Sequence, residues 1–259
     1  MGKPVILITN DDGNNAPGLR YLIDTLRNMA KLYVVASEYP MSGQGHAITV
    51  RAPLRLHPVD QDHDYAEYSC NGTPVDCIKL GKNLVIGGKP DLVVSGINHG
   101  SNAAVNIVYS GTMAAVIEAC IDGIPAIGFS LTDYSRKADF SHCDTVVKSI
   151  VKNVLEQGLP EDTCLNVNIP AVNGTAIRGV KVCRQAKARW IETFDSRKDP
   201  ANKDYHWLTG EFYNRENQKD TDQWALDNNY VSVVPVHFDF TAHKALDHIQ
   251  KWKFNEESD

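Results

Sequence analysis

Two adjacent carboxylates, Asp11 and Asp12, follow the apolar run 5–8 near the start of the chain. A continuous apolar run predicts a strand buried on both faces of a parallel sheet, and ligands bind at the carboxyl ends of such strands. Two like charges this close repel unless a cation or a proton intervenes, and carboxylate oxygens suit Mg²⁺ or Mn²⁺. Asp-Asp-Gly is equally typical of a turn in which Gly13 takes a positive φ. This pattern alone therefore leaves a metal site and a plain turn open.

A second polar cluster, Ser95-Gly96-Ile97-Asn98-His99-Gly100-Ser101-Asn102, follows the apolar run 91–95. Glycines let backbone N–H groups approach an anion, and the side chains of Asn98 and Asn102 offer neutral amides to a metal or a phosphate. The pattern fits neither the Walker loop nor the dinucleotide fingerprint. An Asn/Gly-rich connection without a ligand is the alternative, although it is less expected for two loops on the same sheet edge.

Small and hydroxyl residues begin a helix predicted at about 111–120. Ser110, Gly111 and Thr112 lie at its start, where hydroxyls and free N–H groups bind phosphate without any basic side chain. Ser110 or Thr112 can also serve as an ordinary N-cap, and the two roles are compatible.

A fourth loop, 37–46, leaves the strand predicted at 32–36 and should open near the first and third clusters. Ser42 in this loop can add a neutral oxygen ligand, although Ser-Gly alone is a common turn. Two histidines lie in candidate loops, His46 here and His99 in the second cluster. Either is a candidate general acid or substrate contact, and the sequence does not decide between these roles.

The composition excludes some classes of protein. The 259 residues carry a formal net charge of −6, which argues against stable binding of nucleic acid or of an anionic membrane. An anionic substrate must then be held by a local device such as a cation or a helix N-terminus. The six cysteines lie far apart without a CxxC pair, which predicts neither a zinc site nor a disulfide framework. With no expected signal peptide or membrane span, we expect a cytoplasmic protein.

Alternating strands and helices predict an α/β fold, a three-layer α/β/α sandwich with a mostly parallel sheet, built as one domain over 1–259. An edge strand or hairpin is expected within 47–56 and 65–69. The other expected strands are 5–8, 32–36, 91–95, 125–129, 164–169 and 230–236, and the expected helices are 17–29, 74–80, 111–120, 140–155 and 241–254. Periodicity weakens in the polar segment 185–225, which we expect, with the C-terminal segment 241–259, at subunit interfaces.

Taken in order, these motifs closely resemble those of the survival protein E (SurE) family of metal-dependent phosphatases, which act as 5'- and 3'-nucleotidases. The matching stretches are 8–13, 42–45, 71–74, 91–100 with Asn102, 109–112 and 165–170. Two stretches depart from the family: 199–202 reads Asp-Pro-Ala-Asn in place of Asp-Pro-Arg-Gly, and 205–207 reads Tyr-His-Trp in place of Tyr-Tyr-Trp. The family is usually dimeric or tetrameric.

The resemblance also implies roles for single residues. Carried over position by position, it implies that a divalent metal, Mg or Mn, is bound by Asp11, Asp12, Ser42 and Asn98, with Asn10 beside it. It implies that the substrate phosphate is cradled by Ser110, Gly111 and Thr112 in a pocket shaped by Gly96 and Asn102. Asp11, Asp12, Asn98 and Asn10 are accordingly the expected catalytic residues.

The expected reaction is metal-assisted hydrolysis of nucleoside 5'- and 3'-monophosphates, with Asp11 orienting the attacking water. A covalent aspartyl-phosphatase is a weaker interpretation, because that class separates its two acidic residues by one position. A Mg-dependent nucleotide-binding or receiver-like regulatory module without turnover is the alternative from another class, although the chain is long for a receiver.

Overall fold

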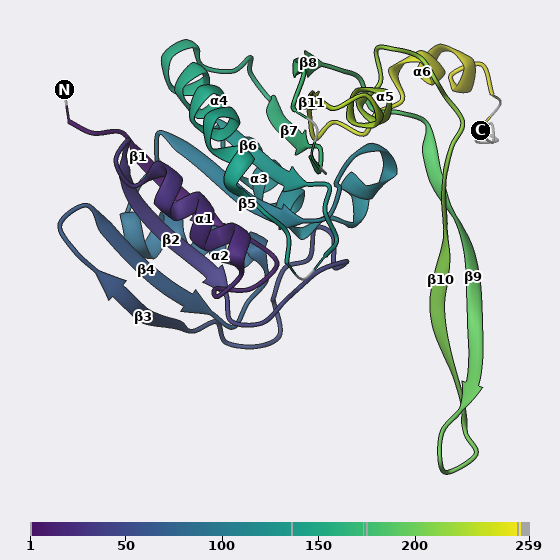
Figure 1. The fold of residues 1–259 in the computed structure, drawn as a ribbon, viewed down its shortest axis with the longest axis horizontal. Helices are drawn as coiled ribbons and strands as arrows, with labels where there is room; N and C mark the ends of the chain where they lie inside the picture. The colour runs from purple at the N-terminus through teal and green to yellow at the C-terminus, as the bar shows by residue number, and fades with distance from the viewer. Residues whose placement is uncertain (1, 136, 173, 175, 253, 255–259) are drawn as a thin grey trace, which may run out of the picture.

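A mixed, mostly parallel sheet forms the centre of the computed structural model, which describes residues 2–135, 137–172, 174, 176–252 and 254. Within these residues its nine strands run in the order β3-β4-β2-β1-β5-β6-β7-β11-β8 (Figure 1). The strands are β1 Val5–Thr9, β2 Lys31–Ser37, β3 Leu56–Gln61, β4 Tyr65–Cys70, β5 Leu92–His99, β6 Ala126–Leu131, β7 Cys164–Ile169, β8 Gly179–Val182 and β11 Tyr230–Val236. Within this sheet, the described residues pair antiparallel only between β3 and β4 and between β11 and β7.

Helices cover both faces of this sheet, which confirms the expected three layers. Helices α1 (Pro17–Leu26) and α4 (Asp144–Gln157) pack on one face, and α2 (Pro74–Leu80) and α3 (Gly111–Ile121) pack on the other. The central strands are buried on both sides, as their continuous apolar runs predict. A capping box between Thr73 and Asp76 begins α2, where the sequence places the N-cap.

The segment before Leu56 differs from the sequence expectation. Residues 47–55 form no strand, although their alternation suggested one, and the edge strand β3 begins only at Leu56. The reason lies in their backbone partners: the amide of Thr49 donates to the Asp76 carboxylate, and that of Arg55 donates to the Asn71 side chain. Amides bonded to side chains in this way are not available to a neighbouring strand.

Other helices also differ from the expectation in extent. The helix expected at 17–29 ends at Leu26, and the helix expected at 140–155 is a 3₁₀ turn, Ser141–Cys143, followed by α4. The helix expected at 241–254 is the shorter α6, His243–Ile249, and residue 253 lies outside the described residues. Strand β8 was not expected. The segment 185–225 forms a long hairpin of β9 (Ala188–Lys198) and β10 (Asp204–Asn214) that projects from the body, followed by α5 (Asp222–Asp227) (Figure 1). No helix of the described residues is long and apolar enough to cross a membrane.

Gly18 allows α1 to approach β5 closely. A Cβ at this position would lie 2.0 Å from the backbone oxygen of Ile97 and 3.1 Å from the Phe140 ring. We therefore expect Gly18→Ala to lower the free energy of unfolding by about 1–3 kcal/mol through overpacking, although alanine favours a helix by about 1 kcal/mol. Denaturant unfolding measures it. Gly88→Ala is the control, because a Cβ there would have no atom within 4 Å and its φ is ordinary; equal stability of the two variants would contradict the prediction.

Candidate functional site

The polar loops meet at one edge of the sheet. Strands β1 and β5 are adjacent and parallel, with Thr9 paired to Ser95, so the loops that follow them emerge side by side. The loop after β2 joins them, because the amide of Met41 donates to the Asp11 carbonyl at 2.7 Å. The start of α3 completes the cluster, because the Thr112 hydroxyl donates a hydrogen bond to Asp11. The structure thus brings the four loops expected from the sequence to a single place.

Asp11 is buried beneath the first turn of α3. Its side chain is 2% exposed, and its Oδ1 accepts a hydrogen bond of 2.5 Å from the Thr112 hydroxyl. Gly111 makes the approach possible, since a Cβ there would lie 2.7 Å from the Asp11 Cβ and 2.9 Å from its Oδ2. Burial, and next the charge of Asp12, raise the pKa of Asp11 to about 6.

Asp12 links two of the loops. Its Oδ2 accepts a 2.9 Å hydrogen bond from the backbone amide of His99. Ser42, in the loop after β2, is exposed. Burial raises the pKa of Asp12 despite the hydrogen bond from His99. Asn98 lies nearby on the same loop as His99 and is 8% exposed. Its side-chain nitrogen donates to the Gly100 carbonyl at 2.8 Å, which leaves the amide oxygen for a ligand.

Asn10 contributes a buried oxygen that the protein does not use. Its side-chain nitrogen donates to the Gly13 carbonyl at 3.0 Å, whereas its Oδ1 is buried without a hydrogen-bond partner among the described residues. Buried polar atoms are seldom left unpaired. An orphaned amide oxygen next to the buried Asp11 and the half-buried Asp12 forms the all-oxygen donor set that suits a hard divalent cation. The residues present therefore fit such a cation.

The start of α3 has N–H groups aimed at the same region. Ser110 is its N-cap and accepts the amide of Met113 at 3.1 Å, and the Thr112 hydroxyl is engaged by Asp11. Both hydroxyls therefore have protein partners. A phosphate placed here would meet the N–H groups of the first turn, beginning with Gly111, together with the positive end of the helix dipole.

A family model described as "Survival protein SurE" matches residues 6–192 of the chain. The chain belongs to the SurE family. It is 53% identical to a Flavobacterium psychrophilum protein named 5'-nucleotidase SurE, over 98% of this chain and 100% of that one, and 52% identical to a protein of the same name from Christiangramia forsetii, over 98% of each. The crystal structure of a SurE protein from Aquifex aeolicus superposes with a TM-score of 0.82 at 40% identity, covering 95% of this chain and 98% of that one.

In this SurE-family chain, Asn102 lies in a buried amide network rather than free in the pocket. Its backbone N–H donates to Asn168 Oδ1 at 2.8 Å, and its side-chain nitrogen donates to the Ser130 hydroxyl at 2.9 Å. Asn166 in turn donates to the Asn102 carbonyl at 2.9 Å. The network ties the loop to β6 and β7. Sequence reasoning missed it, although two asparagines in an otherwise apolar strand were a usable signal.

Close packing against β6 requires glycine at position 96. Its φ is +129°, and a Cβ there would lie 2.3 Å from the Phe129 carbonyl oxygen, so the loop after β5 can follow this path only with glycine. The nearby His99 contributes its backbone amide to Asp12, while its ring lies 6.5 Å from that of Phe140 and its Nε2 is buried without a partner among the described residues.

His46 has partners that sequence reasoning also missed. Its Nε2 lies 3.0 Å from Glu118 Oε2 on α3, and the second carboxylate oxygen of Glu118 bonds to Lys79. The hydrogen bond with His46, together with the one from Lys79, lowers the pKa of Glu118 to about 2. Because His46 and Glu118 are 72 positions apart, no local motif marks the pair.

Asp11 should destabilise the metal-free SurE-family fold at neutral pH. Its folded pKa of about 6 exceeds the ordinary 3.8, so its favourable contribution is full below pH 3.8 and is lost as the pH rises through 6. In EDTA at pH 7.5 we expect Asp11→Asn to raise the free energy of unfolding by up to about 3 kcal/mol. The gain should shrink at pH 5. Urea unfolding at both pH values measures it, and a variant less stable than wild type at pH 7.5 would contradict it.

Proposed function

We propose that this chain is a divalent-metal-dependent phosphomonoesterase that hydrolyses nucleoside 5'- and 3'-monophosphates to nucleoside and phosphate. The observation that carries the proposal is the Asp11–Asp12 pair, with Asp11 buried against the N-terminus of α3. Relatives named 5'-nucleotidase match nearly the whole chain at 52–53% identity, which supports the nucleotidase class. The alternative of a nucleotide-binding module without turnover is not favoured by those names.

We assign the cation, Mg²⁺ or Mn²⁺, to Asp11, Asp12, Ser42 and Asn98, with Asn10 beside it. The orphaned oxygen of Asn10 and the mutual repulsion of the two carboxylates support this assignment. When bound, such a cation polarises a phosphate oxygen and lowers the pKa of a water molecule.

The protein groups have separate tasks in this reaction. The first-turn N–H groups of α3 bind the phosphate oxygens, and the Asn98 amide stabilises the charge that spreads over them in the transition state. Asp11 orients the attacking water. The hydroxyl of Thr112 holds the Asp11 carboxylate in place, and Gly96 and Asn102 shape the surrounding loop. The six cysteines are all free and buried, which supports placing the reaction in the reducing cytoplasm.

The direct test removes one carboxylate charge. We expect Asp12→Asn to reduce metal-dependent release of phosphate from AMP more than ~100-fold, since loss of even an outer partner of a metal ligand typically costs 10–100-fold. Addition of EDTA to the wild type should have a comparable effect. Asp60→Asn, on the exposed edge strand β3, is the matched control and should leave turnover unchanged. Undiminished turnover in Asp12→Asn, or in EDTA, would refute the proposal.

We also propose that the chain is a single domain whose segment 185–225, with the β9–β10 hairpin, and C-terminal segment 241–259 lie at subunit interfaces of a homodimer or homotetramer. Residues 253 and 255–259 of the latter lie outside the described part of the chain. A two-stranded hairpin is marginal alone in water, yet this one exposes several large apolar side chains. On the hairpin these are Trp190, Ile191, Phe194, Tyr205, Trp207, Leu208 and Tyr213.

Substitutions on one face of the hairpin test whether it forms the subunit interface. Phe194 and Leu208 are directly opposed across the strands, so Phe194→Glu with Leu208→Lys removes apolar surface while an ion pair holds the hairpin together. In sedimentation experiments we expect the wild type to be oligomeric and this double variant to dissociate to monomer. Val59→Lys, at an exposed apolar site on β3, should remain oligomeric. An unchanged oligomer in the double variant would count against the hairpin interface.

A further inference from the structure

A short 3₁₀ helix, Ala104–Tyr109, leads directly into α3 and is called the lead-in segment below. Ser110, the N-cap of α3, follows its last residue. The N–H groups of the first turn of α3 are the proposed phosphate ligands. The path of the lead-in segment therefore helps to set the direction in which these N–H groups point.

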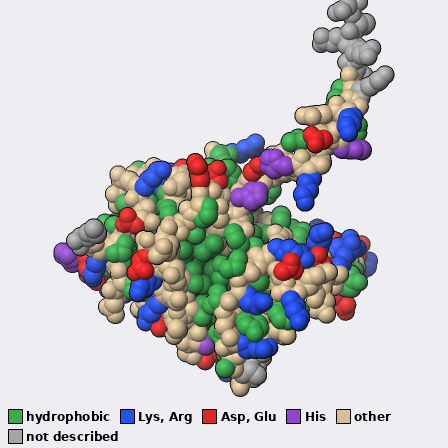
Figure 2. Space-filling view, turned by 90° about the horizontal axis from the view of Figure 1, so that it is seen from above, with side chains coloured by type: hydrophobic (Ala, Val, Ile, Leu, Met, Phe, Trp, Pro, Cys, Tyr) green, Lys and Arg blue, Asp and Glu red, His purple; other side chains and the backbone are tan. Residues whose placement is uncertain are grey.

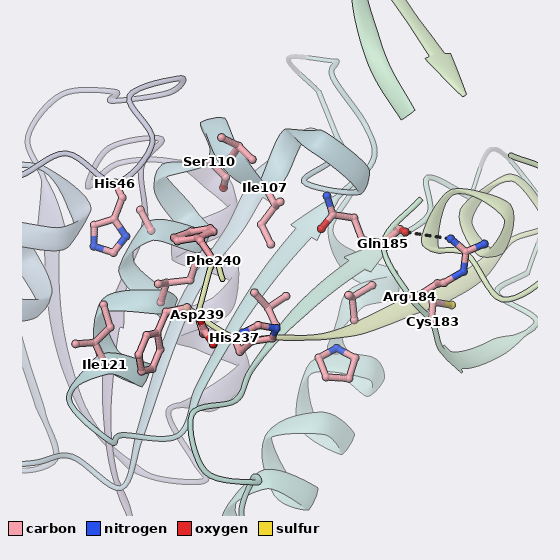
Figure 3. Close-up of a pocket in the computed structure, with 17 residues that line it drawn as sticks. His46, Ile107, Ser110, Ile121, Cys183, Arg184, Gln185, His237, Asp239 and Phe240 are labelled. Atoms are coloured by element: carbon pink, nitrogen blue, oxygen red, sulfur yellow. Dashed lines mark hydrogen bonds between the residues drawn. The ribbon is translucent and has the colours of Figure 1, made fainter. Parts of the chain in front are cut away.

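One side of the lead-in segment is open. Ile107, Val108 and Ser110 line a cavity of about 1010 Å³, and Val108 is 61% exposed. Figure 3 shows Ile107 and Ser110 among the lining residues, with Gln185 and Arg184 to their right. Figure 2 shows hydrophobic side chains gathered on one face of the molecule, beside the arm that carries the C-terminal residues. Because a cavity borders this side, the position of the segment depends on contacts made elsewhere.

The strongest of these contacts is with Asp222, the fully buried first residue of α5. Its Oδ2 accepts the backbone N–H of Ala104 at 2.8 Å. Its Oδ1 accepts the backbone N–H of Ala186 at 2.9 Å and that of Gln223 at 2.7 Å. Hydrogen bonds to an ionised acceptor are stronger than those between neutral groups. One carboxylate thus joins the lead-in segment to α5 and to the residues just before β9.

The backbone of Ala104 requires such a restraint. Its φ is +51°, in the left-handed region that is unfavourable for a residue with a Cβ. A conformation of this kind persists where the surrounding structure imposes it. Ala104 is buried and packs with Ala186, Ala188 and Phe212. Its hydrogen bond to Asp222 therefore holds the turn that begins the lead-in segment.

Trp190 on β9 provides a second restraint. Its Nε1 donates to the side-chain oxygen of Asn106 at 2.8 Å, and the Asn106 nitrogen donates to the carbonyl of Ser101 at 3.2 Å. The Trp190 ring packs edge-on against Phe212, with 5.5 Å between ring centroids. The lead-in segment is thus held at two points by residues more than 80 positions away in the chain.

We infer that Asp222 is a positioning residue for the phosphate site. Through Ala104 it fixes the lead-in segment, and with it the direction of the first N–H groups of α3. The inference rests on the proposed function, since it needs a phosphate at the start of α3. The cation should not depend on Asp222, because Asn102 fastens the chain to β6 and β7 between Asn98 and Ala104. Phosphate affinity and cation affinity should therefore respond separately to its loss.

Asp222→Asn breaks one of these links selectively. The amide oxygen can replace only one carboxylate oxygen, and in the place of Oδ1 it keeps Ala186 and Gln223. The NH₂ group then faces the N–H of Ala104, and two donors cannot bond. We expect the inhibition constant of inorganic phosphate in Mn²⁺-dependent hydrolysis of AMP to rise ~10-fold, because displacement of a binding group by about 1 Å can cost ~100-fold in rate.

Calorimetric titrations give readouts without turnover. The dissociation constant of inorganic phosphate should rise in Asp222→Asn by the same factor as its inhibition constant. The affinity for Mn²⁺ alone should change less than about twofold, as expected for separate sites without shared partners. A residue that served only the stability of the fold would not separate the two affinities.

Two control variants separate positioning from stability. Val147→Ala removes buried methyl groups from α4, on the opposite face of the sheet from α3, and should lower the midpoint of thermal unfolding with no change in phosphate affinity. Asp91→Asn alters another carboxylate that accepts a backbone N–H, that of Val5 at 2.7 Å. Asp91 precedes β5, at the amino end of the sheet, so both affinities should be unchanged.

Trp190→Phe keeps the inference testable if Asp222→Asn does not fold. It removes the N–H that bonds to Asn106 and keeps an aromatic ring against Phe212. We expect the inhibition constant of phosphate to rise ~3-fold, the scale of one neutral hydrogen bond. Sedimentation of each variant, compared with the dissociated Phe194→Glu/Leu208→Lys variant, shows whether the assembly is kept.

Four results would overturn the inference: unchanged phosphate affinity in both Asp222→Asn and Trp190→Phe, equal losses of phosphate and Mn²⁺ affinity, an equal loss of phosphate affinity in Val147→Ala, or a loss that the dissociated variant reproduces in full. A wild type that binds phosphate more tightly than Asp222→Asn, yet hydrolyses no phosphomonoester, would refute the proposed function and support the role of Asp222.

Discussion

The burial of the Asp11 carboxylate under the first turn of α3 is the constraint on which the site depends. It requires glycine at 111, because any larger residue would strike the carboxylate, and it uses the Thr112 hydroxyl to hold that carboxylate in place. Once α3 is fixed in this way, its N-terminus faces the loops after β1, β2 and β5. Stability is sacrificed here, because two neighbouring carboxylates are partly or fully removed from water.

The same arrangement explains how a chain with a net charge of −6 could handle an anion. In the proposed site the anion is attracted by a cation held by acidic and amide oxygens, and by the N–H groups at the start of one helix. Such a device acts at short range and does not attract extended polyanions. The rest of the surface is therefore free to remain acidic.

Much of this organisation is predictable from local patterns, and the remainder depends on contacts between distant residues. The buried strands and the clusters around Asp11, Asn98 and Ser110 follow from apolar runs that end in polar and glycine residues. The carboxyl ends of parallel strands lie at the same edge of a sheet, so the clustering of these polar segments is also predictable. Of the strand expected within 47–56, residues 47–55 form none, because Asp76 and Asn71 accept two of their backbone amides. His46 pairs with Glu118 across 72 positions. The alternation of apolar and polar residues does not show which distant side chains will contact a segment in the folded protein, and these contacts decided both outcomes.

Helix α3 packs on the sheet and on α2. The same first turn carries the N–H groups that face the loops and the Thr112 hydroxyl that holds the Asp11 carboxylate. Any shift of the helix along its axis would therefore move both groups together. The spacing between the buried carboxylate and these N–H groups is thus set by the helix backbone, independently of how the surrounding loops move.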